Sequence, residues 1–204
     1  MGKAFYKDLV FEFSDDVYGP REDSFLMADV VAEHAKGKFL DLGCGCGVQG
    51  VVAAKSDKVY HVVSSDINPQ AVEDAKENAE KMCAAGKMEF IQGDLFEHVG
   101  CCFDCIAFNP PYLPTKSGER VKGGLNYAFD GGDDGRLVTV RFIHEAGRFL
   151  KPGGFLLLLS STVADFDATV QDLRDKGFVV SFVGEKKLFF EKLVVLKAVL
   201  KKNG

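Results

Sequence analysis

Three features of the sequence predict an α/β fold. Short apolar runs rich in Val, Leu, Ile and Phe alternate with longer amphipathic stretches, a rhythm typical of parallel strands joined by crossover helices. Several of these runs end at an acidic residue, an asparagine or a glycine-rich turn, as strands do at the ligand-binding edge of an open sheet. The last two runs follow each other too closely for a crossover helix. We therefore predict a Rossmann-like, seven-stranded, mostly parallel sheet with helices on both faces, whose last two strands form an antiparallel edge pair.

The individual elements are predicted from the apolar runs and the signals that flank them. Buried strands are expected at residues 38–42, 59–65, 88–92, 103–108 and 155–160. Helices are expected at residues 69–85, 136–150 and 163–176. Asn68 can cap the first of these helices, and Pro69 suits its first position because proline lacks an amide hydrogen. Lys151-Pro-Gly-Gly154 is expected to turn the chain into the fifth strand. The closing strands are expected at residues 178–184 and 192–200.

The N-terminal residues, up to about 35, are expected to form a short lid segment on a single domain that spans residues 1–204. A chain of this length suffices for one sizeable core. Phenylalanine alternates with charged residues around positions 9–13, which suggests a small strand, and residues 23–34 have the pattern of an amphipathic helix.

Charge and hydropathy narrow the classes of partner. The chain has 30 acidic and 25 basic residues, a net charge of -5 and a sequence pI of about 5.4. This acidity weakens attraction to phosphate backbones, so a nucleic-acid partner is disfavoured. No apolar run approaches the roughly 20 residues that a membrane helix needs, and no secretory signal precedes the first charged residues. A cytoplasmic protein without a membrane partner is expected.

The six cysteines are expected to be buried thiols. They lack the spacing of a disulfide framework, and no histidine lies beside them at zinc-finger spacing, so no metal site is predicted. The cysteines are Cys44, Cys46, Cys83, Cys101, Cys102 and Cys105.

A glycine-rich turn follows the first core strand, where Phe39-Leu-Asp-Leu-Gly-Cys-Gly-Cys-Gly47 leads into a helix. Gly45, Gly47 and Gly50 satisfy the G-x-G-x-x-G spacing of dinucleotide sites, which by itself is a weak signal. Asp41, however, places a carboxylate where a dinucleotide would hold its negatively charged pyrophosphate. A cationic ligand without phosphate, such as S-adenosylmethionine (SAM), is favoured there on Coulomb grounds.

Two further acids, Asp66 and Asp94, follow the second and third predicted strands. Asp66 is expected to accept hydrogen bonds from both ribose hydroxyls of the cofactor, and Asp94 from its adenine amino group. A single aspartate at a strand end is as often a turn or cap residue. Three acids at successive strand ends favour a ligand site instead.

The fourth predicted strand ends in Phe108-Asn-Pro-Pro-Tyr112, which borders the same crevice. An amide or aromatic amine nitrogen attacks poorly because its lone pair is delocalised, so its N–H bonds must be held and its lone pair aimed. Asn109 offers a side-chain carbonyl oxygen and Pro110 a backbone carbonyl oxygen for the two hydrogens of an NH2 group. Pro111 is expected to fix the turn, and Tyr112 to stack on a flat acceptor. The predicted catalytic residues are therefore Asn109, Pro110, Pro111 and Tyr112.

These motifs together resemble those of the HemK-type glutamine N5-methyltransferases, a group of class I SAM-dependent enzymes. The resemblance covers nearly the whole chain. Val17-Tyr-Gly-Pro-Arg-Glu-Asp-Ser24 and Gly131-Gly-Asp-Asp-Gly-Arg136 are similar to the Y-x-P-x-E-D-[ST] and G-G-x-x-G-R segments of the archaeal and eukaryotic branch. The resemblance implies methyl transfer from SAM to the glutamine amide in the Gly-Gly-Gln motif of a class 1 translation termination (release) factor, with S-adenosyl-L-homocysteine as product.

The resemblance also implies site residues and a partner. Many members of the branch work with a small zinc-binding activator subunit, so such a partner is expected beside the protein substrate. Gly19 departs from the family, in which relatives often carry Glu at this position, and this bears on the role of the lid segment. Cofactor contacts are implied for Tyr18, Ser24, Asp41, Gly43, Gly45, Asp66, Ile67, Asp94, Leu95 and Asn109.

Other functions stay open on the residues alone. An rRNA or DNA amino-group methyltransferase, acting on adenine N6 or guanine N2, uses the same Asn-Pro-Pro-Tyr motif, but the acidic charge counts against it. A protein lysine methyltransferase is a further alternative, although a lysine amine needs deprotonation more than lone-pair alignment. A noncatalytic binding subunit is disfavoured by the complete set of residues 109–112, and an NAD-dependent oxidoreductase by the charge of Asp41.

Overall fold

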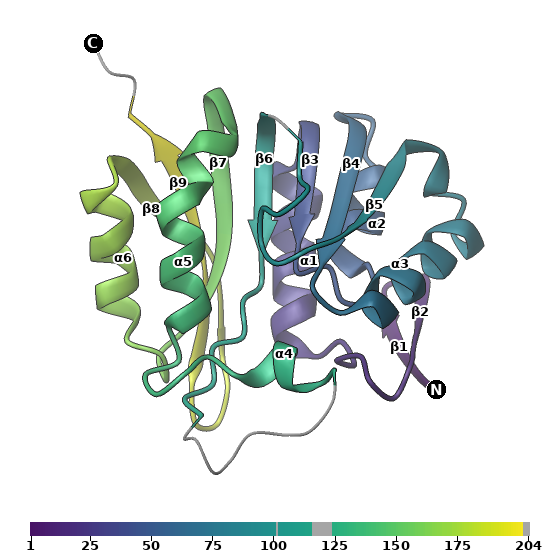
Figure 1. Cartoon of the computed structure of the whole chain (residues 1–204), viewed down its shortest axis with the longest axis horizontal. Helices are drawn as coiled ribbons and strands as arrows, with labels where there is room; N and C mark the ends of the chain where they lie inside the picture. The colour runs from purple at the N-terminus through teal and green to yellow at the C-terminus, as the bar shows by residue number, and fades with distance from the viewer. Residues whose placement is uncertain (101, 116–123, 202–204) are drawn as a thin grey trace.

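The computed structural model describes residues 1–100, 102–115 and 124–201. In this part of the chain the main sheet has seven strands in the order β5-β4-β3-β6-β7-β9-β8 (Figure 1). β3 to β7 run parallel, whereas β9 is antiparallel to both β7 and β8. The predicted fold class is therefore confirmed. The strands are β3 (Gly37–Leu42), β4 (Val59–Asp66), β5 (Met88–Gln92), β6 (Phe103–Phe108), β7 (Leu150–Ser161), β8 (Phe178–Lys187) and β9 (Lys192–Leu200).

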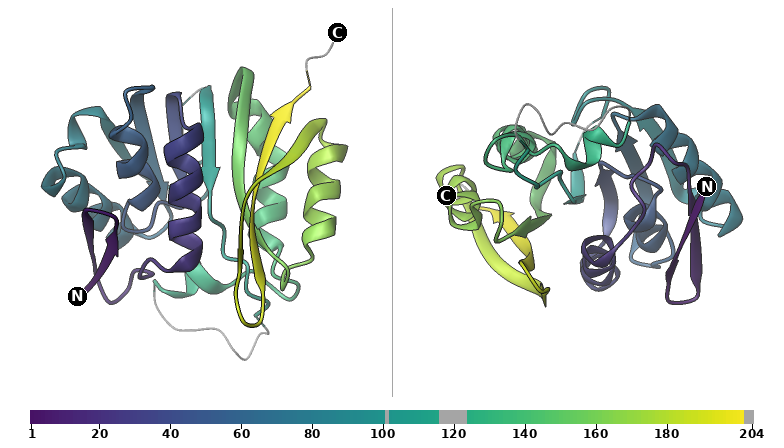
Figure 2. Two further views of the ribbon diagram at one scale, coloured as in Figure 1. Left: turned by 180° about the vertical axis from the view of Figure 1, so that it is seen from behind. Right: turned by 90° about the horizontal axis from the view of Figure 1, so that it is seen from below.

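Helices cover both faces of the sheet, and Figure 2 shows α1 and α2 on the face opposite α5 and α6. α3 shares its apolar cluster with α1 and α2. A four-residue helix, α4, lies at the carboxyl ends of the strands (Figure 1). The helices are α1 (Glu22–His34), α2 (Val48–Ala54), α3 (Pro69–Lys81), α4 (Asn126–Phe129), α5 (Leu137–Ala146) and α6 (Phe166–Asp175).

The core lies on both sides of the central strands, because a parallel sheet is covered on both faces. In β7, Leu157 and Leu159 pack with α1 and α2, whereas Leu156 and Leu158 pack with α5 and α6. All four side chains are fully buried. Successive side chains of a strand point to opposite faces, so the run of leucines serves both layers at once.

α3 begins as predicted and ends earlier. The Asn68 side chain accepts a hydrogen bond from the Gln70 amide, which is the expected N-cap, and Pro69 occupies the first turn. The helix ends at Lys81 rather than at residue 85, because Cys83 has a left-handed backbone conformation with φ of +56°.

β7 also differs from the prediction. It begins at Leu150, so the Lys151–Gly154 run lies within the strand instead of forming a separate turn. Opposite this run, the pairing with β6 shifts register between Phe103 and Cys105. β7 therefore has more residues than β6 between the paired positions Phe103–Leu150 and Cys105–Phe155. The additional residues form a local irregularity near the start of β7, as in a β-bulge.

The N-terminal segment contains a hairpin that the sequence predicted only in part. β1 (Gly2–Tyr6) pairs antiparallel with β2 (Leu9–Phe13), of which only β2 was expected. The hairpin is fastened to α3, where Asn78 Nδ2 donates to the Glu12 carbonyl oxygen at 2.7 Å. Neither hairpin strand lines the cavity described below; the lining residues from this segment are Asp16, Val17, Tyr18, Pro20, Asp23 and Ser24. That the N-terminal segment acts as a lid stays a prediction.

The cysteines follow the prediction in part. Cys44, Cys46 and Cys105 are buried, Cys102 is half-buried, and Cys101 lies outside the described residues. Cys83 is exposed, which corrects the expectation, because it sits in the turn after α3. Within the described ranges, no helix combines the length and the hydrophobicity needed to cross a bilayer.

Candidate active site

A cavity of about 400 Å³ lies at the carboxyl ends of β3, β4, β5 and β6. This volume is within the range of roughly 300–1,000 Å³ that is usual for small-molecule sites. Among the described residues that line it, five are aspartates and one, Arg141, is basic. Such a lining suits a cationic ligand and disfavours a pyrophosphate group.

The turn between β3 and α2 brings backbone close to the cavity. Gly43 and Gly45 both line it and have φ of +63° and +52°, a conformation that glycine adopts without strain. The Gly45 amide donates to Asp66 Oδ2 at 2.9 Å. A Cβ at Gly43 would lie 3.0 Å from the Phe108 ring. The turn is thus packed between two strand ends and held by a carboxylate.

Asp66, at the end of β4, is bound by backbone on both of its oxygens. Oδ1 accepts from the Asn68 amide and Oδ2 from the Gly45 amide, each at 2.9 Å. Burial raises the pKa of this carboxyl, and the backbone hydrogen bonds oppose that rise. A carboxylate has about four acceptor sites, so Asp66 keeps the capacity to accept ligand hydroxyls.

Asp94 lies at the outer edge of the cavity and is already paired. Its Oδ2 contacts the Arg141 guanidinium of α5 at 2.7 Å. Both side chains are partly exposed, so the pair is screened by water and contributes little to stability. The sequence analysis did not identify Arg141, whose helical position gave no sign of facing the end of β5.

Asp41 does not line the cavity, in contrast to its predicted cofactor contact. The residue is 2% exposed, and its Oδ2 accepts from the Gly50 amide in α2 at 2.8 Å. Burial raises the pKa of Asp41 to about 7. Because Asp41 does not line the cavity, the Coulomb argument made from the sequence depends on the aspartates that do line it, such as Asp66.

The Asn-Pro-Pro-Tyr loop lines the cavity and contains a buried acceptor without a partner among the described residues. Asn109 Nδ2 donates to Asp23 Oδ2 at 3.0 Å. Asn109 Oδ1 is buried and has no hydrogen-bond partner among the described residues. Pro110 and Pro111 are buried, and Tyr112 is half-buried with its pKa raised by burial. Since buried polar atoms are normally hydrogen-bonded, the free Oδ1 marks a place for an N–H donor.

The Gly131–Arg136 segment supports this loop from behind. The Gly131 amide donates to the Leu113 carbonyl oxygen at 3.1 Å, so the two chain segments run together. A Cβ at Gly135 would lie 2.4 Å from the Tyr112 carbonyl oxygen. Arg136 anchors the segment to α6 by pairing with Asp172. The segment is therefore a structural support for the loop, a role that its sequence alone did not indicate.

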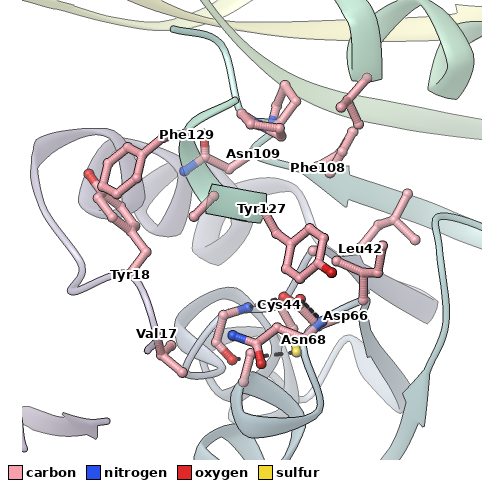
Figure 3. A pocket seen from close by; sticks show the side chains of 18 of the residues that line it. Val17, Tyr18, Leu42, Cys44, Asp66, Asn68, Phe108, Asn109, Tyr127 and Phe129 are labelled. Carbon is pink, nitrogen blue, oxygen red and sulfur yellow. Dashed lines mark hydrogen bonds between the residues drawn. The ribbon is translucent and has the colours of Figure 1, made fainter. Parts of the chain in front are cut away.

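Aromatic side chains form the remaining wall, as Figure 3 shows. The rings of Tyr18 and Phe129 meet edge to face at 5.4 Å between centroids. Tyr127 extends from α4 toward Leu42 and Asp66 in Figure 3. α4 was not predicted, because four residues are too few for a helical periodicity to appear in sequence.

With the exception of Asp41, the predicted site residues are brought together at this cavity. Lining residues that the sequence analysis missed include Asp23, Asn68, Tyr127, Phe129 and Arg141. The predicted residues that line it are Tyr18, Ser24, Gly43, Gly45, Asp66, Ile67, Asp94, Leu95, Asn109, Pro110, Pro111 and Tyr112.

Comparison with known proteins places the chain among methyltransferases. Residues 19–122 match the methyltransferase small domain family. A Methanocaldococcus jannaschii protein, provisionally named a protein N5-glutamine methyltransferase, is 40% identical over 183 residues that cover 90% of this chain and 91% of the relative. The release factor glutamine methyltransferase of Synechocystis sp. is 31% identical over 78% of this chain, which spans only 58% of that relative's length.

A solved structure has the same fold. The E. cuniculi Mtq2–Trm112 complex, which is responsible for methylation of the termination factor eRF1, matches with a TM-score of 0.71 and 24% identity. The match covers 91% of this chain and 99% of the matched chain. At this level of identity the likeness concerns the fold.

Proposed function

This chain belongs to the protein N5-glutamine methyltransferases of the methyltransferase small domain family, and from that membership we propose that it methylates the side-chain amide nitrogen of a protein glutamine, with SAM as the methyl donor. The acceptor we propose is the glutamine of the Gly-Gly-Gln motif of a class 1 translation termination factor. Bacterial relatives are named for release factors, which supports this choice and a cytoplasmic location.

The observation that carries the proposal is the buried, unpaired Oδ1 of Asn109. A buried acceptor without a hydrogen bond is energetically unfavourable unless a bound ligand donates a hydrogen bond to it. A carboxamide NH2 group brings two N–H donors, of which Asn109 Oδ1 would accept one and the Pro110 carbonyl oxygen the other. Both hydrogens would then be held, and the nitrogen lone pair would point into the cavity.

The described residues fit SAM on three counts. The glycine turn leaves room for close approach of a ligand, Asp66 retains acceptor capacity for ribose hydroxyls, and the carboxylate-rich lining suits a positive charge. We propose that Asp66, Asp94, Ile67 and Leu95 hold the nucleoside part, with Tyr18, Ser24 and the Gly43–Gly45 turn around the rest. When bound, SAM supplies an electrophilic methyl group on a positively charged sulfur.

The protein's contribution to the reaction is mainly positioning. Asn109 and Pro110 would orient the acceptor nitrogen toward the methyl group that bound SAM would supply. On gaining the methyl group, with S-adenosyl-L-homocysteine as the leaving group, the nitrogen would release one proton to water. Tyr112 would pack on the flat amide, and Pro111 would keep the loop rigid. Orientation of this kind can lower a barrier by up to about 7–11 kcal/mol.

The test is methylation of a purified termination factor with labelled SAM. We expect label on the glutamine of the Gly-Gly-Gln motif, located by mass spectrometry of the digested acceptor. A matched acceptor with glutamic acid in place of that glutamine lacks the NH2 group and should stay unlabelled. Absence of label on the glutamine acceptor, with and without an activator subunit, would exclude this substrate.

A small zinc-binding activator subunit is part of the proposal. The E. cuniculi protein of the same fold was solved as a complex with Trm112, which supports a comparable partner here. We expect a small zinc protein to co-purify with this chain and to increase the methylation rate. Full activity of the isolated chain, unchanged by such a subunit, would argue against this partner.

A further inference from the structure

Asp23, in the first turn of α1, contacts Asn109 although 86 positions separate the two residues. Asp23 is only 5% exposed. Its Oδ2 accepts from Asn109 Nδ2 at 3.0 Å, and its Oδ1 accepts from the Tyr18 hydroxyl at 3.1 Å and the Ser24 hydroxyl at 3.4 Å. One carboxylate oxygen thus accepts from Tyr18 and Ser24, and the other accepts from Asn109 of the Asn-Pro-Pro-Tyr loop.

The chemistry of Asp23 decides which end of the Asn109 amide faces it. A carboxylate only accepts hydrogen bonds, so the NH2 group of Asn109 must face Asp23 and its carbonyl oxygen must face away. The opposite orientation would set the carbonyl oxygen against a carboxylate oxygen at a position that is shielded from water, which is unfavourable. The buried Oδ1 without a partner is a direct consequence of this contact.

We infer that Asp23 is a positioning residue for methyl transfer, which holds Asn109 with its carbonyl oxygen turned toward the acceptor nitrogen. The inference rests on the proposed function, because this orientation is useful only for an acceptor that brings N–H bonds. A flipped Asn109 would present its NH2 group to the acceptor's NH2 group, and two donors cannot pair. Tyr18 serves the same purpose by donating to Asp23, in addition to any contact with the cofactor.

The first test removes the carboxylate. Asp23→Leu keeps a branched side chain and loses both acceptor oxygens, so kcat should fall by about 10–100-fold, the range for a hydrogen bond to a charged group. The dissociation constant for SAM should change by less than about tenfold. Asp23→Asn retains one acceptor oxygen for Asn109 and should recover most of the lost kcat. A loss confined to KM or to cofactor affinity would overturn the inference.

Asp29→Leu is the matched control. Asp29 lies on the same helix, and its carboxylate also accepts a hydrogen bond from a tyrosine, the Tyr6 hydroxyl, at 2.8 Å. Unlike Asp23, Asp29 does not line the cavity. Its replacement should leave kcat unchanged. A cooperative thermal unfolding transition is expected for both leucine variants and serves as the check that each one folds.

The second test asks whether Asp23 acts through Asn109. In the Asn109→Ala background, Asp23→Leu should lower kcat no further, because the group that it orients is absent. Independent, multiplicative losses in the double variant would show that Asp23 acts by another route and would overturn the inference.

A third measurement needs no acceptor. The side-chain NH2 signals of Asn109, identified by their absence in Asn109→Ala, should exchange slowly with water in the wild type and faster in Asp23→Leu. Equal exchange rates in the two proteins would overturn the inference. Failure of the wild type to methylate any protein glutamine, with this difference in exchange intact, would instead reject the proposed function.

Discussion

The two halves of the cavity differ in how their polar groups are satisfied. At the ends of β4 and β5, Asp66 accepts two backbone hydrogen bonds and Asp94 pairs with Arg141. At the end of β6, Asn109 donates to Asp23 and leaves its own oxygen buried and unpaired. In the first half the carboxylates are paired before a ligand binds, although Ser65 Oγ in β4 is also buried without a partner among the described residues. In the second half we propose that a ligand pairs with the Asn109 oxygen.

This difference has a physical meaning for the two ligands. A site whose carboxylates are held by backbone keeps its shape and can bind a cofactor with little reorganisation. A site with one unpaired buried acceptor discriminates strongly, because a ligand without the matching donor leaves that acceptor unsatisfied. We therefore expect the half at β4 and β5, the cofactor half, to govern cofactor affinity. The half at β6, the acceptor half, is expected to govern turnover and the choice of methyl acceptor.

Asn109→Ala affects only the acceptor half and is expected to have the largest effect. Turnover should fall by about 10²–10³-fold, the range for removing one hydrogen-bonding group that is positioned for the transition state. Cofactor affinity should change by less than about tenfold. Single-turnover methylation and calorimetry with SAM measure the two quantities. Equal losses of turnover and of cofactor affinity would show that the two halves of the cavity do not act separately.

Gly135→Ala disturbs the acceptor half from behind. The new Cβ would lie 2.4 Å from the Tyr112 carbonyl oxygen, at a residue with φ of +76°. The loop must move, and turnover should fall by up to about 10²-fold, as for a displacement of about 1 Å. The left-handed backbone alone should lower the free energy of unfolding by about 1–2 kcal/mol.

Gly153→Ala is the matched control for this prediction. Gly153 has φ of +79°, and an added Cβ would meet no atom within 4 Å. The variant should share the backbone penalty in chemical denaturation and keep full turnover. If Gly135→Ala also keeps full turnover, the support of the loop by residues 131–136 is not needed for activity.

Asp66→Ala affects the cofactor half. The dissociation constant for SAM should rise by about 10–100-fold, because hydrogen bonds to a charged group are lost. Turnover at saturating SAM should change much less than in Asn109→Ala. Asp94→Ala is expected to have a smaller effect on affinity, since Asp94 is partly exposed and screened. Calorimetry measures the dissociation constant for SAM in the two variants. A larger rise in Asp94→Ala than in Asp66→Ala would contradict the role given to Asp66 in cofactor binding.

Asp41→Asn is expected to change turnover least, because Asp41 does not line the cavity. Its effect should appear in the pH dependence of stability. Burial raises the folded-state pKa to about 7, whereas the unfolded-state value is about 3.9. The folded protein therefore binds the extra proton between these values, and the stability linked to Asp41 is lost as pH rises from about 4 to about 7.

Chemical denaturation of both proteins across this pH range gives the measurement. The unfolding free energy of the wild type should fall relative to that of Asp41→Asn as pH rises, and the difference should level off above pH of about 7. Two curves that stay parallel throughout would show that Asp41 is not the buried titrating group.

The sequence determined the fold and the location of the site. Apolar runs of the right length placed the main strands within a few residues, because burial on both faces requires continuous apolar sequence. Strand-end residues such as Asp66, Asp94 and Asn109 could be assigned to one edge, because parallel strands end at the same side of the sheet. Local capping signals, such as Asn68 and Pro69, were equally readable.

Only the tertiary structure decided how these side chains are oriented and paired. Asp41 turns toward the Gly50 amide instead of the cavity, and Asp94 meets Arg141 from a distant helix. Asp23 reaches Asn109 across 86 positions. Periodicity in a sequence reports which face of an element is buried, whereas a hydrogen bond depends on the distance and angle between atoms that only the packing of separate elements brings together.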